Sequence, residues 1–517
     1  MGSSRNNNLN IIERISAMNR RLFIRRSLSF AGLAVCRPGI VFAAKHGEYL
    51  SGKPNLVFGA ISDIHVRPLP RRKDAYFTEF WRKSLELFRD QGADAVIAAG
   101  DLCNSGVVDE MQQFADTWFD VFPNDTTPDG RKVERIFVYG NHDVSLPMAR
   151  IACKNDKNEM KKRAIALDRA GSWKRIFKEE FSDVYRKTVK GYDFIGAHWE
   201  GGLKGRDDSF CAGLEAFYDK IGSSLSKSKP FFHVQHPHPN GTCHGEAVWG
   251  QDDGVSTRVL SRYPNAVSFS GHSHNSLLDE RAIWQGAFTS VGTATASHIG
   301  PSAIKSCLEC GFTGFENYKT YGKTAKAREQ ADRAKVMPMM DRTKGRQAQI
   351  VRVYDDRIVF SRYDLYDLKP LAEDLVMPLD MAKSKPFAFA PRYEAAKCPL
   401  FPVGAKVSVS FCEANHRGDA KKAKKTKSVL ISVPAANAEP SARGVYYNVV
   451  AECGAKKLAV SVLHDSFRFR AGDKRSERPL ECKIALDRLP KGDVTFKVTA
   501  FSWWNKPSHT LETTCQI

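Results

Sequence analysis

Short apolar runs alternate with longer polar stretches through the first half of the chain. The runs are bounded by polar residues or glycine, which is typical of strands buried on both faces. They occupy residues 56–61, 95–99, 136–139, 192–197, 231–234 and 266–269. Between the first two, residues 77–89 carry apolar side chains at near-helical spacing. The order strand, helix, strand predicts an α/β domain over about residues 55–278.

The pattern changes beyond this region. Residues 302–344 are rich in Lys, Gly and Ala without a clear period, and we expect an insertion or lid there. The apolar segments 350–354 and 357–360, separated by two aspartates, predict a hairpin that closes the first domain near residue 380. Residues 382–391 contain two prolines and are interpreted as a linker.

Apolar and polar residues alternate strictly in parts of the C-terminal region. Residues 406–411 and 494–499 each offer one face to a core and one to water. Short strands at this density predict a small all-β sandwich of immunoglobulin or fibronectin type III character. The lysine-rich run 420–427 is most simply a solvated loop, with an anionic surface as the alternative partner. The predicted domains are an α/β domain at 52–381 and a β-sandwich at 388–517.

The first 44 residues resemble a bacterial twin-arginine export signal. Arg20 and Arg21 are followed by Phe and Ile, by a modest apolar stretch at 28–35, and by small residues suited to cleavage. The apolar stretch is too short to remain as a transmembrane helix. We therefore expect an exported protein, periplasmic or extracellular, whose true start is Met1 or Met18. A basic N-terminal helix is the alternative interpretation.

Composition narrows the classes of partner. The chain has 517 residues, 42% of them apolar and 26% charged, which is typical of a soluble protein with more than one globular unit. A net charge of +20 favours anionic partners such as phosphate esters, nucleic acid or an anionic envelope polymer. Part of this excess lies in the leader and in the lysine-rich run. General nucleic-acid binding is therefore disfavoured, although nucleic acid is not excluded as a partner.

Cysteine usage does not determine a disulfide framework. The chain has twelve cysteines, of which Cys36 lies in the leader, so an odd number remains and at least one thiol is unpaired in a monomer. Cys307 and Cys310 have half of a zinc-ribbon spacing without a second pair. A local disulfide or two ordinary thiols are favoured there over a structural zinc.

Five of the apolar runs end in residues that bind metal ions. The five sets, in chain order, are Asp63-Ile64-His65, Gly100-Asp101, Gly140-Asn141-His142-Asp143, His236 and Gly271-His272-Ser273-His274. Asp, Asn and His supply the oxygen and nitrogen ligands that first-row divalent metals take. Because the carboxyl ends of parallel strands meet at one edge of a sheet, we expect these side chains in one crevice. Each motif alone is weak, whereas the ordered series predicts a polynuclear metal site.

Several histidines near these motifs have more than one interpretation. His233 falls within a predicted strand, where a buried and hydrogen-bonded side chain is the ordinary outcome. His236 directly follows that strand and is the preferred ligand, while His238 is a candidate substrate neighbour or a loop residue. The run 192–197 ends at His198 and Trp199, which are candidates for the crevice, although ordinary packing is favoured for Trp199.

At these motifs the sequence resembles the calcineurin-like metallophosphoesterases. The resemblance covers about residues 55–278 and implies a four-layer α/β/β/α sandwich with two metal ions in its crevice. It implies that the first ion is held by Asp63, His65 and His274. The second would be held by Asn141, His236 and His272, and Asp101 would bridge the two. His142 would face the scissile phosphate and assist the leaving oxygen, and Asp143 would orient His142.

The resemblance implies a phosphoesterase that hydrolyses phosphate mono- or diesters by attack of a metal-bridging hydroxide. The two divalent ions would be Mn, Zn, Fe or Co according to supply. Protein phosphatase activity is disfavoured, because Gly100-Asp101 is not followed by Asp-Arg-Gly and the third motif ends in Asp143 rather than Glu. The ferric-tyrosinate site of purple acid phosphatases is not expected, because His65 stands where they have tyrosine. The alternatives are an exonuclease or nucleotidase, or a catalytically inactive envelope-binding protein.

Overall fold

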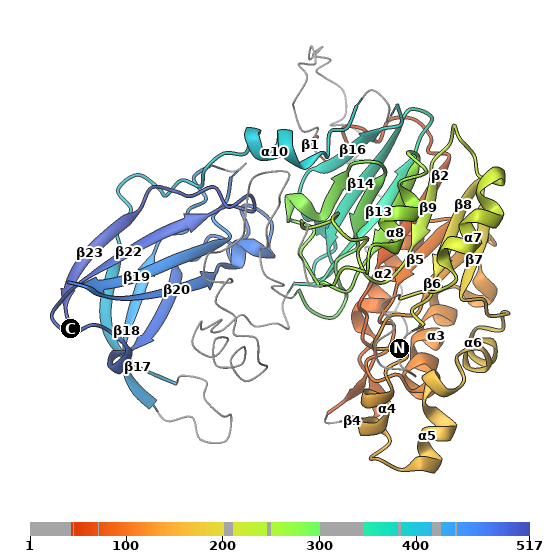
Figure 1. Ribbon diagram of the computed structural model, residues 1–517, viewed down its shortest axis with the longest axis horizontal. Helices are drawn as coiled ribbons and strands as arrows, with labels where there is room; N and C mark the ends of the chain where they lie inside the picture. Colours follow the sequence, from red (N-terminus) through yellow and green to blue (C-terminus); the bar gives the residue numbers. More distant parts are fainter. Residues whose placement is uncertain are drawn as a thin grey trace, which may run out of the picture. The chain divides into compact units, whose positions relative to one another are not determined.

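The structure is a computed structural model (Figure 1). It describes residues 43–44, 46–70, 72–200, 210–245, 250–299, 345–380, 384–415, 425–439 and 442–517. Almost all of the predicted leader, the predicted insertion at 302–344, and Cys307 and Cys310 lie outside the described residues. Within these ranges, no helix combines the length and the apolar character that a membrane span requires. The nine cysteines in the described part of the chain are all free thiols.

The first large sheet has eight strands. The strands on its main path, in spatial order, are β1 (Ala43–Ala44), β16 (Asp374–Pro378), β14 (Arg357–Asp364), β13 (Gln347–Val353), β2 (Leu56–Ile61), β5 (Ala95–Ala99) and β6 (Glu134–Val138). β15 (Lys369–Pro370) pairs with β14. β2, β5 and β6 run parallel, and the remaining pairs are antiparallel.

The second large sheet has six strands. Their order is β11 (Ile283–Gln285), β12 (Thr289–Gly292), β10 (Ala266–Ser270), β9 (Phe231–Val234), β8 (Tyr192–Ala197) and β7 (Val184–Val189). The four strands from β12 to β8 are parallel, while β11 and β7 pair antiparallel at the two edges. All six predicted apolar runs are therefore strands, and their continuous apolar character follows from burial on both faces.

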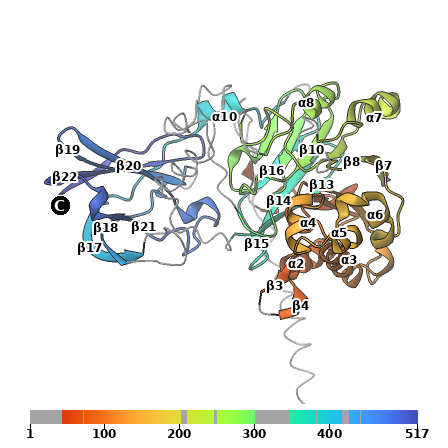
Figure 2. The ribbon, with the colours of Figure 1, turned by 60° about the horizontal axis from the view of Figure 1, so that its bottom comes forward.

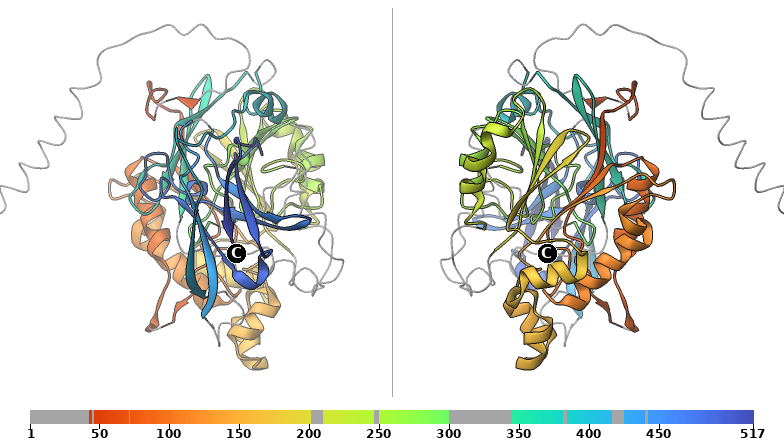
Figure 3. Two further views of the ribbon diagram at one scale, coloured as in Figure 1. Left: turned by 90° about the vertical axis from the view of Figure 1, so that its left-hand side faces the viewer. Right: turned by 90° about the vertical axis from the view of Figure 1, so that its right-hand side faces the viewer.

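The two sheets pack face to face. The Phe58 ring of β2 meets Phe194, Phe232 and Phe269 of the second sheet, with ring centroids 4.8–5.4 Å apart. Helices cover both outer faces, as the orange and green layers of Figure 3 show. The first sheet is covered by α2 (Glu79–Asp90), α3 (Val108–Val121) and α6 (Arg169–Phe177), and the second by α7 (Leu214–Ile221) and α8 (Val255–Leu260) (Figure 2). The four-layer α/β/β/α architecture is confirmed.

The helix predicted at 77–89 is α2. Its buried face includes Phe80, Trp81, Leu85 and Phe88, one turn apart along the helix. The Trp81 ring stacks on Phe114 of α3 with centroids 4.6 Å apart, so the apolar faces of the two helices pack against each other. α2 joins β2 to β5 and thereby sets these two strands parallel, with their carboxyl ends at the same edge.

Shorter elements complete this part of the chain. The remaining strands and α-helices are β3 (Pro68–Leu69), β4 (Arg72–Tyr76), α4 (Leu146–Ala152) and α5 (Lys157–Arg163). The 3₁₀ segments of the described chain are η1 (Pro123–Asp125), η2 (Ile165–Leu167), η3 (Gly222–Ser224), η4 (Glu280–Ala282), η6 (Asp465–Phe467) and η7 (Leu486–Arg488). The predicted hairpin is confirmed as β13 and β14. Because β13 also pairs with β2, the hairpin lies in the middle of the sheet.

The C-terminal strands form two small antiparallel sheets around one core (blue in Figure 1). One sheet has the order β17 (Ser408–Asn415), β18 (Lys425–Val433), β21 (Leu480–Ala485). The other has the order β20 (Lys456–Leu463), β19 (Tyr446–Cys453), β22 (Asp493–Phe501), β23 (Leu511–Gln516). The predicted all-β sandwich is therefore confirmed.

Two local predictions need correction. The lysine-rich run 420–427 was predicted as a loop. Residues 420–424 lie outside the described residues, but 425–427 are the start of β18, which pairs with β17 in a ladder that reaches Asn415. Residues 382–391 were interpreted as a linker, but Phe387 and Phe389 are buried and α10 (Phe389–Ala395) begins within this segment. Burial of the two phenylalanine side chains is favourable, and it outweighs the tendency of a proline-containing segment to stay extended.

Candidate metal centre

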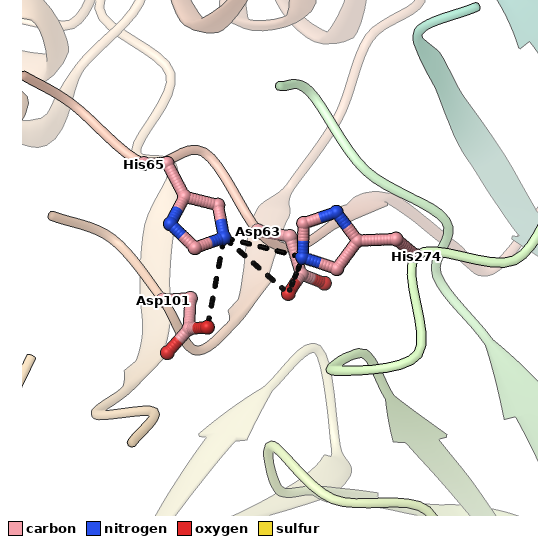
Figure 4. Close-up of side chains that lie close together, drawn as sticks. All are labelled: Asp63, His65, Asp101 and His274. Carbon is pink, nitrogen blue, oxygen red and sulfur yellow. Dashed lines mark hydrogen bonds and ion pairs between the residues drawn. The ribbon is translucent and has the colours of Figure 1, made fainter. Parts of the chain in front are cut away.

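The loops after five strands bring predicted ligands into one cluster. Each strand β2, β5, β6, β9 and β10 ends just before one of the five motifs. The ligand atoms form two groups, and within each group all of them lie within 4.8 Å of one another. One group is Asp63, His65, Asp101 and His274 (Figure 4), and the other is Asp101, His236 and His272. Asp101 is therefore common to both groups.

Each of the two carboxylates has one oxygen held by backbone and one facing imidazoles. Asp63 Oδ2 accepts a hydrogen bond from the His272 backbone N–H at 3.0 Å, while Oδ1 lies 3.0 Å from His274 Nε2. Asp101 Oδ1 accepts from the His142 backbone N–H at 2.8 Å. Asp101 Oδ2 lies 3.2 Å from His236 Nε2 and 3.6 Å from His65 Nε2. The backbone contacts thus leave one oxygen of each carboxylate directed at the cluster.

Two of the four ligand imidazoles are oriented by backbone carbonyls. His236 Nδ1 lies 2.7 Å from the Ala99 carbonyl oxygen, and His274 Nδ1 lies 3.0 Å from the His298 carbonyl oxygen. Since a carbonyl only accepts, each Nδ1 carries a hydrogen, and Nε2 is the nitrogen of each ring that faces the cluster. The Nε2 atoms of His65 and His274 are 3.2 Å apart. Imidazole nitrogens and carboxylate oxygens converging in this way fit divalent cations.

Burial and mutual charge set the protonation of the cluster. Burial lowers the pKa of His65 well below its ordinary value and lowers that of His272 to about 3, so both rings are neutral at pH 7. Burial alone would raise the pKa of Asp63, but the neighbouring His274 holds it well below the usual range. His236 has the same effect on the pKa of Asp101. Burial alone would lower the pKa of His236, but Asp101 raises it to about 9, and Asp63 likewise raises the pKa of His274. A metal ion that binds to these two rings would displace their Nε2 protons.

Most of the ligand residues have a left-handed backbone. The five with positive φ are Asp63 (49°), His65 (49°), Asp101 (53°), His272 (68°) and His274 (54°). This conformation is uncommon for residues other than glycine and persists only where the surroundings hold it in place. Such strain concentrates at functional sites, and here it falls on the residues that face the cluster.

Glycines in the motifs allow side chains to approach the backbone closely. A Cβ atom at Gly271 would lie 2.6 Å from Asp63 Oδ2, and one at Gly100 would lie 2.6 Å from the His236 Cγ atom. Any larger residue would displace a predicted ligand. The glycines before Asp101 and His272 are therefore part of the site, because they leave room for side chains from other strands.

His142 and Asp143 both contact backbone groups of the loop after β5. His142 Nδ1 lies 2.8 Å from the Asn104 carbonyl oxygen, and its ring meets the His65 ring edge to face at 4.6 Å. The Asp143 carboxylate instead accepts backbone N–H groups of Cys103 and Gly140, both at 2.7 Å. The Asp143 carboxylate therefore has backbone partners, and its predicted role in orienting His142 stays a prediction. Asp143 ties together the loops after β5 and β6, and the Asn104 carbonyl orients His142.

The residues on either side of Asn141 both contact Asp101. Gly140 packs against the Asp101 side chain, and the His142 N–H donates to it. The Asn141 Oδ1 atom is buried and has no hydrogen-bond partner among the described residues. A buried amide oxygen without a partner is costly, and a cation would satisfy it.

The other histidines considered from the sequence have structural partners. His233 is buried between the Tyr218 hydroxyl (3.0 Å) and Gln235 Oε1 (2.7 Å), as predicted. His238 is buried between the hydroxyls of Ser270 and Ser273, both at 2.7 Å, and does not face the cluster. It is therefore not placed as a substrate neighbour.

His198 and Trp199, which follow β8, have different surroundings. His198 Nδ1 accepts the Tyr139 backbone N–H at 3.0 Å, so this ring supports the loop before Asn141. The Trp199 ring lies 5.5 Å from the His272 ring and 6.0 Å from the His236 ring, measured between centroids. Trp199 therefore forms an apolar wall beside the second ligand group.

Sequence reasoning missed the groups that orient the ligands. The carbonyls of Ala99, Asn104 and His298 are backbone atoms and leave no signal in residue type. The His298 side chain was also missed, although its ring lies 4.3 Å from the His274 ring. A histidine shortly after β12 was the available signal, but it belongs to no motif.

Comparisons with known proteins found one family model and several solved structures that are similar to parts of this chain. Residues 56–276 match the sequence model of the calcineurin-like phosphoesterase family. Among solved structures, purple acid phosphatase PPD1 from yellow lupin (Lupinus luteus) is 11% identical over 65% of this chain and 57% of its own, with a TM-score of 0.37. This chain thus spans little more than half of the lupin protein.

Two smaller solved structures are also similar. Vps29 complexed with Zn²⁺ from Entamoeba histolytica is 10% identical over 63% of this chain and 100% of its own, with a TM-score of 0.25. A predicted phosphoesterase from Streptococcus pneumoniae is 9% identical over 62% of this chain and 97% of its own, with a TM-score of 0.23. The search of curated proteins found no match.

Proposed function

We propose that this protein hydrolyses phosphate mono- or diesters with two divalent metal ions, because residues 56–276 match the sequence model of the calcineurin-like phosphoesterase family. The observation that carries the proposal is the sharing of Asp101 by two adjacent groups of ligand atoms. Two bound ions would supply a nucleophile at neutral pH and the positive charge that stabilises the phosphate oxygens during displacement. We expect Mn, Zn, Fe or Co in this donor set.

The residues fit two ions in adjacent positions. Asp63, His65 and His274 would hold the first ion, and His236 and His272 with Asn141 the second. Asp101 would serve both, since its Oδ2 atom faces one imidazole from each group. The hydrogen bond from His142 N–H to Oδ1 keeps this carboxylate from rotating.

His142 is the group that would protonate the leaving oxygen. Its Nδ1–H donates to the Asn104 carbonyl, so Nε2 is the nitrogen that exchanges a proton with substrate. Asn104 is held in turn, because its backbone N–H donates to Glu110 Oε2 at 3.0 Å. The ring is thus fixed from the side opposite its reactive nitrogen.

Single substitutions test these roles. Asp101→Ala removes a ligand from both groups and should abolish binding of both ions and turnover of p-nitrophenyl phosphate and its bis ester. His142→Ala should retain both ions but slow turnover by roughly 10²–10⁴-fold, as loss of a general acid does. His509→Ala is the control, because it changes an exposed histidine of the β-sandwich, outside the candidate site. Unchanged turnover in both site variants would refute the proposal.

The ester preference and any polymeric partner are separate questions. We propose a small phosphate ester as substrate, because the match to the phosphoesterase family model supports phosphate chemistry and does not point to a polymer. A steep fall in turnover of oligonucleotides with rising salt, absent for small esters, would instead favour an exonuclease or nucleotidase. Pull-down with anionic envelope polymer tests whether the C-terminal sandwich binds a surface.

Export is also a proposal, supported by the twin-arginine motif in the sequence. Cell fractionation of the full chain should place the protein outside the cytoplasm. Replacing Arg20 and Arg21 together with lysine should retain it inside. An unchanged distribution would contradict export by this route.

A further inference from the structure

Gln347 lies at the start of β13, far in sequence from the five motifs, and is fully buried. Its side-chain amide contacts two other segments. Oε1 accepts the Leu277 backbone N–H at 2.7 Å, and both amide atoms lie within hydrogen-bond distance of the Ser276 hydroxyl, at 3.1 and 3.2 Å. Nε2 also donates to the Arg468 carbonyl at 3.2 Å. One buried amide therefore connects the sheet, the loop after β10 and the C-terminal region.

The first of these contacts bears on His274. Ser276 and Leu277 follow His274 by two and three residues, so Gln347 fixes the end of the loop that carries it. His274 has a left-handed backbone with φ of 54°, which requires support from its surroundings. The anchored loop end supplies that support.

The backbone of Gln347 bears on Asp63. Its N–H donates to the Thr295 carbonyl at 3.0 Å. The Thr295 hydroxyl donates to the Asp63 carbonyl at 3.0 Å, and the Ser297 N–H donates to the same oxygen at 3.1 Å. The same loop ends at His298, whose carbonyl orients the His274 ring. Both segments that position Asp63 and His274 are thus anchored on one residue.

We propose that Gln347 is a positioning residue for the first ligand group. It sets the geometry of Asp63 and His274, and through the Arg468 carbonyl it makes that geometry depend on the C-terminal region. Asp63 and His274 belong to the first group and not to the second. Loss of the Gln347 side-chain amide leaves the backbone contact to Thr295 in place and releases the loop end that follows His274. It therefore weakens the ion site that contains His274 selectively. This inference rests on the proposed two-ion function.

A matched pair of variants tests the role. Gln347→Met keeps the size of the side chain but removes its hydrogen-bonding groups. Gln349→Met makes the same change two residues further along β13, where the buried amide donates to the Gly292 carbonyl at 3.0 Å. The metal-free full-length proteins are titrated with Co²⁺ while visible absorption reports each binding step. Thermal unfolding of the metal-free proteins measures stability independently.

Gln347→Met should bind one of the two Co²⁺ ions roughly tenfold or more weakly and the other as in the wild type, because groups that orient ligands affect metal affinity by 10–100-fold. Gln349→Met should bind both ions normally, even if its stability falls. Equal Co²⁺ binding by Gln347→Met and wild type, or equal losses in both Met variants, would overturn the inference.

Two further outcomes separate this inference from the proposed function. If Gln347→Met does not fold, Ser276→Ala removes only the hydroxyl partner and should shift the same binding step in the same direction. A folded Ser276→Ala protein with both wild-type affinities would overturn the inference. If the wild-type protein itself binds fewer than two Co²⁺ ions, the proposed two-ion function fails, and with it the basis of the inference.

Discussion

Replacing Gly140 with alanine tests how much free space the site contains. Gly140 follows β6 and has no positive φ, so alanine adopts its backbone without strain. The added Cβ would overlap Asp101 Oδ1 and lie 2.9 Å from the His236 Cδ2 atom. The perturbation is therefore a single methyl group placed between two predicted ligands.

The size of the effect follows from these contacts. The added Cβ would also overlap the Asp101 backbone nitrogen. A carbon needs about 3.5 Å from its neighbours, so both the carboxylate and the backbone of Asp101 must shift by about 1 Å. A misplacement of about 1 Å in a catalytic site costs about 10²-fold in rate. Because Asp101 belongs to both ligand groups, we expect weaker binding of both ions and about 100-fold slower turnover. Overpacking should also cost about 1–3 kcal/mol of stability.

The assay is metal content and ester turnover of Gly140→Ala, with Gly213→Ala as the matched control. A Cβ at Gly213 would meet no atom within 4 Å, and its φ is −80°, so this variant should behave as the wild type. Chemical denaturation separates a loss of fold from a loss of site. If Gly140→Ala held two ions and turned over at the wild-type rate, the close packing around Asp101 would not matter for function.

Three other perturbations have defined outcomes. Chelation should abolish turnover and lower Tm, because ions that bind only the folded state stabilise it, and Mn²⁺ or Zn²⁺ should restore both; an unchanged Tm and rate would argue against resident ions. Phe58→Ala should lower the free energy of unfolding by about 3–5 kcal/mol in denaturant titrations, since the ring is fully buried between the sheets; a loss below about 1 kcal/mol would contradict that packing. The hydrogen bond from Arg475 lowers the pKa of Asp473 to about 2 from an ordinary 3.8. Its stabilisation is therefore present above pH 3.8 and lost as pH falls through 2, so the difference in stability between wild type and Asp473→Asn should shrink over that range, and a constant difference would refute it.

The strands of the α/β domain were predictable because burial on both faces leaves a continuous apolar signature. Residues 56–61, 95–99 and 192–197 match β2, β5 and β8 to the residue. Long-range pairing left no such signature. The placement of β13 beside β2 depends on hydrogen bonds between segments almost three hundred residues apart, which local pattern does not encode.

The candidate site was predictable in its side chains but not in what holds them. His65, Asp101 and His274 have donor atoms of the type that metals take, so residue identity and strand ends sufficed to group them. The orientation of the rings comes from carbonyls of Ala99 and His298, which every residue type possesses. The partners of Asp143 could not be predicted either, because its carboxylate accepts backbone N–H groups of Cys103 and Gly140.

Anomalous diffraction from crystals soaked in Mn²⁺ tests the central claim most directly. We predict two peaks per chain, roughly 3.5–4 Å apart as in two-metal sites, one on each side of the Asp101 carboxylate. A single peak, or two ions that do not share Asp101, would contradict the account.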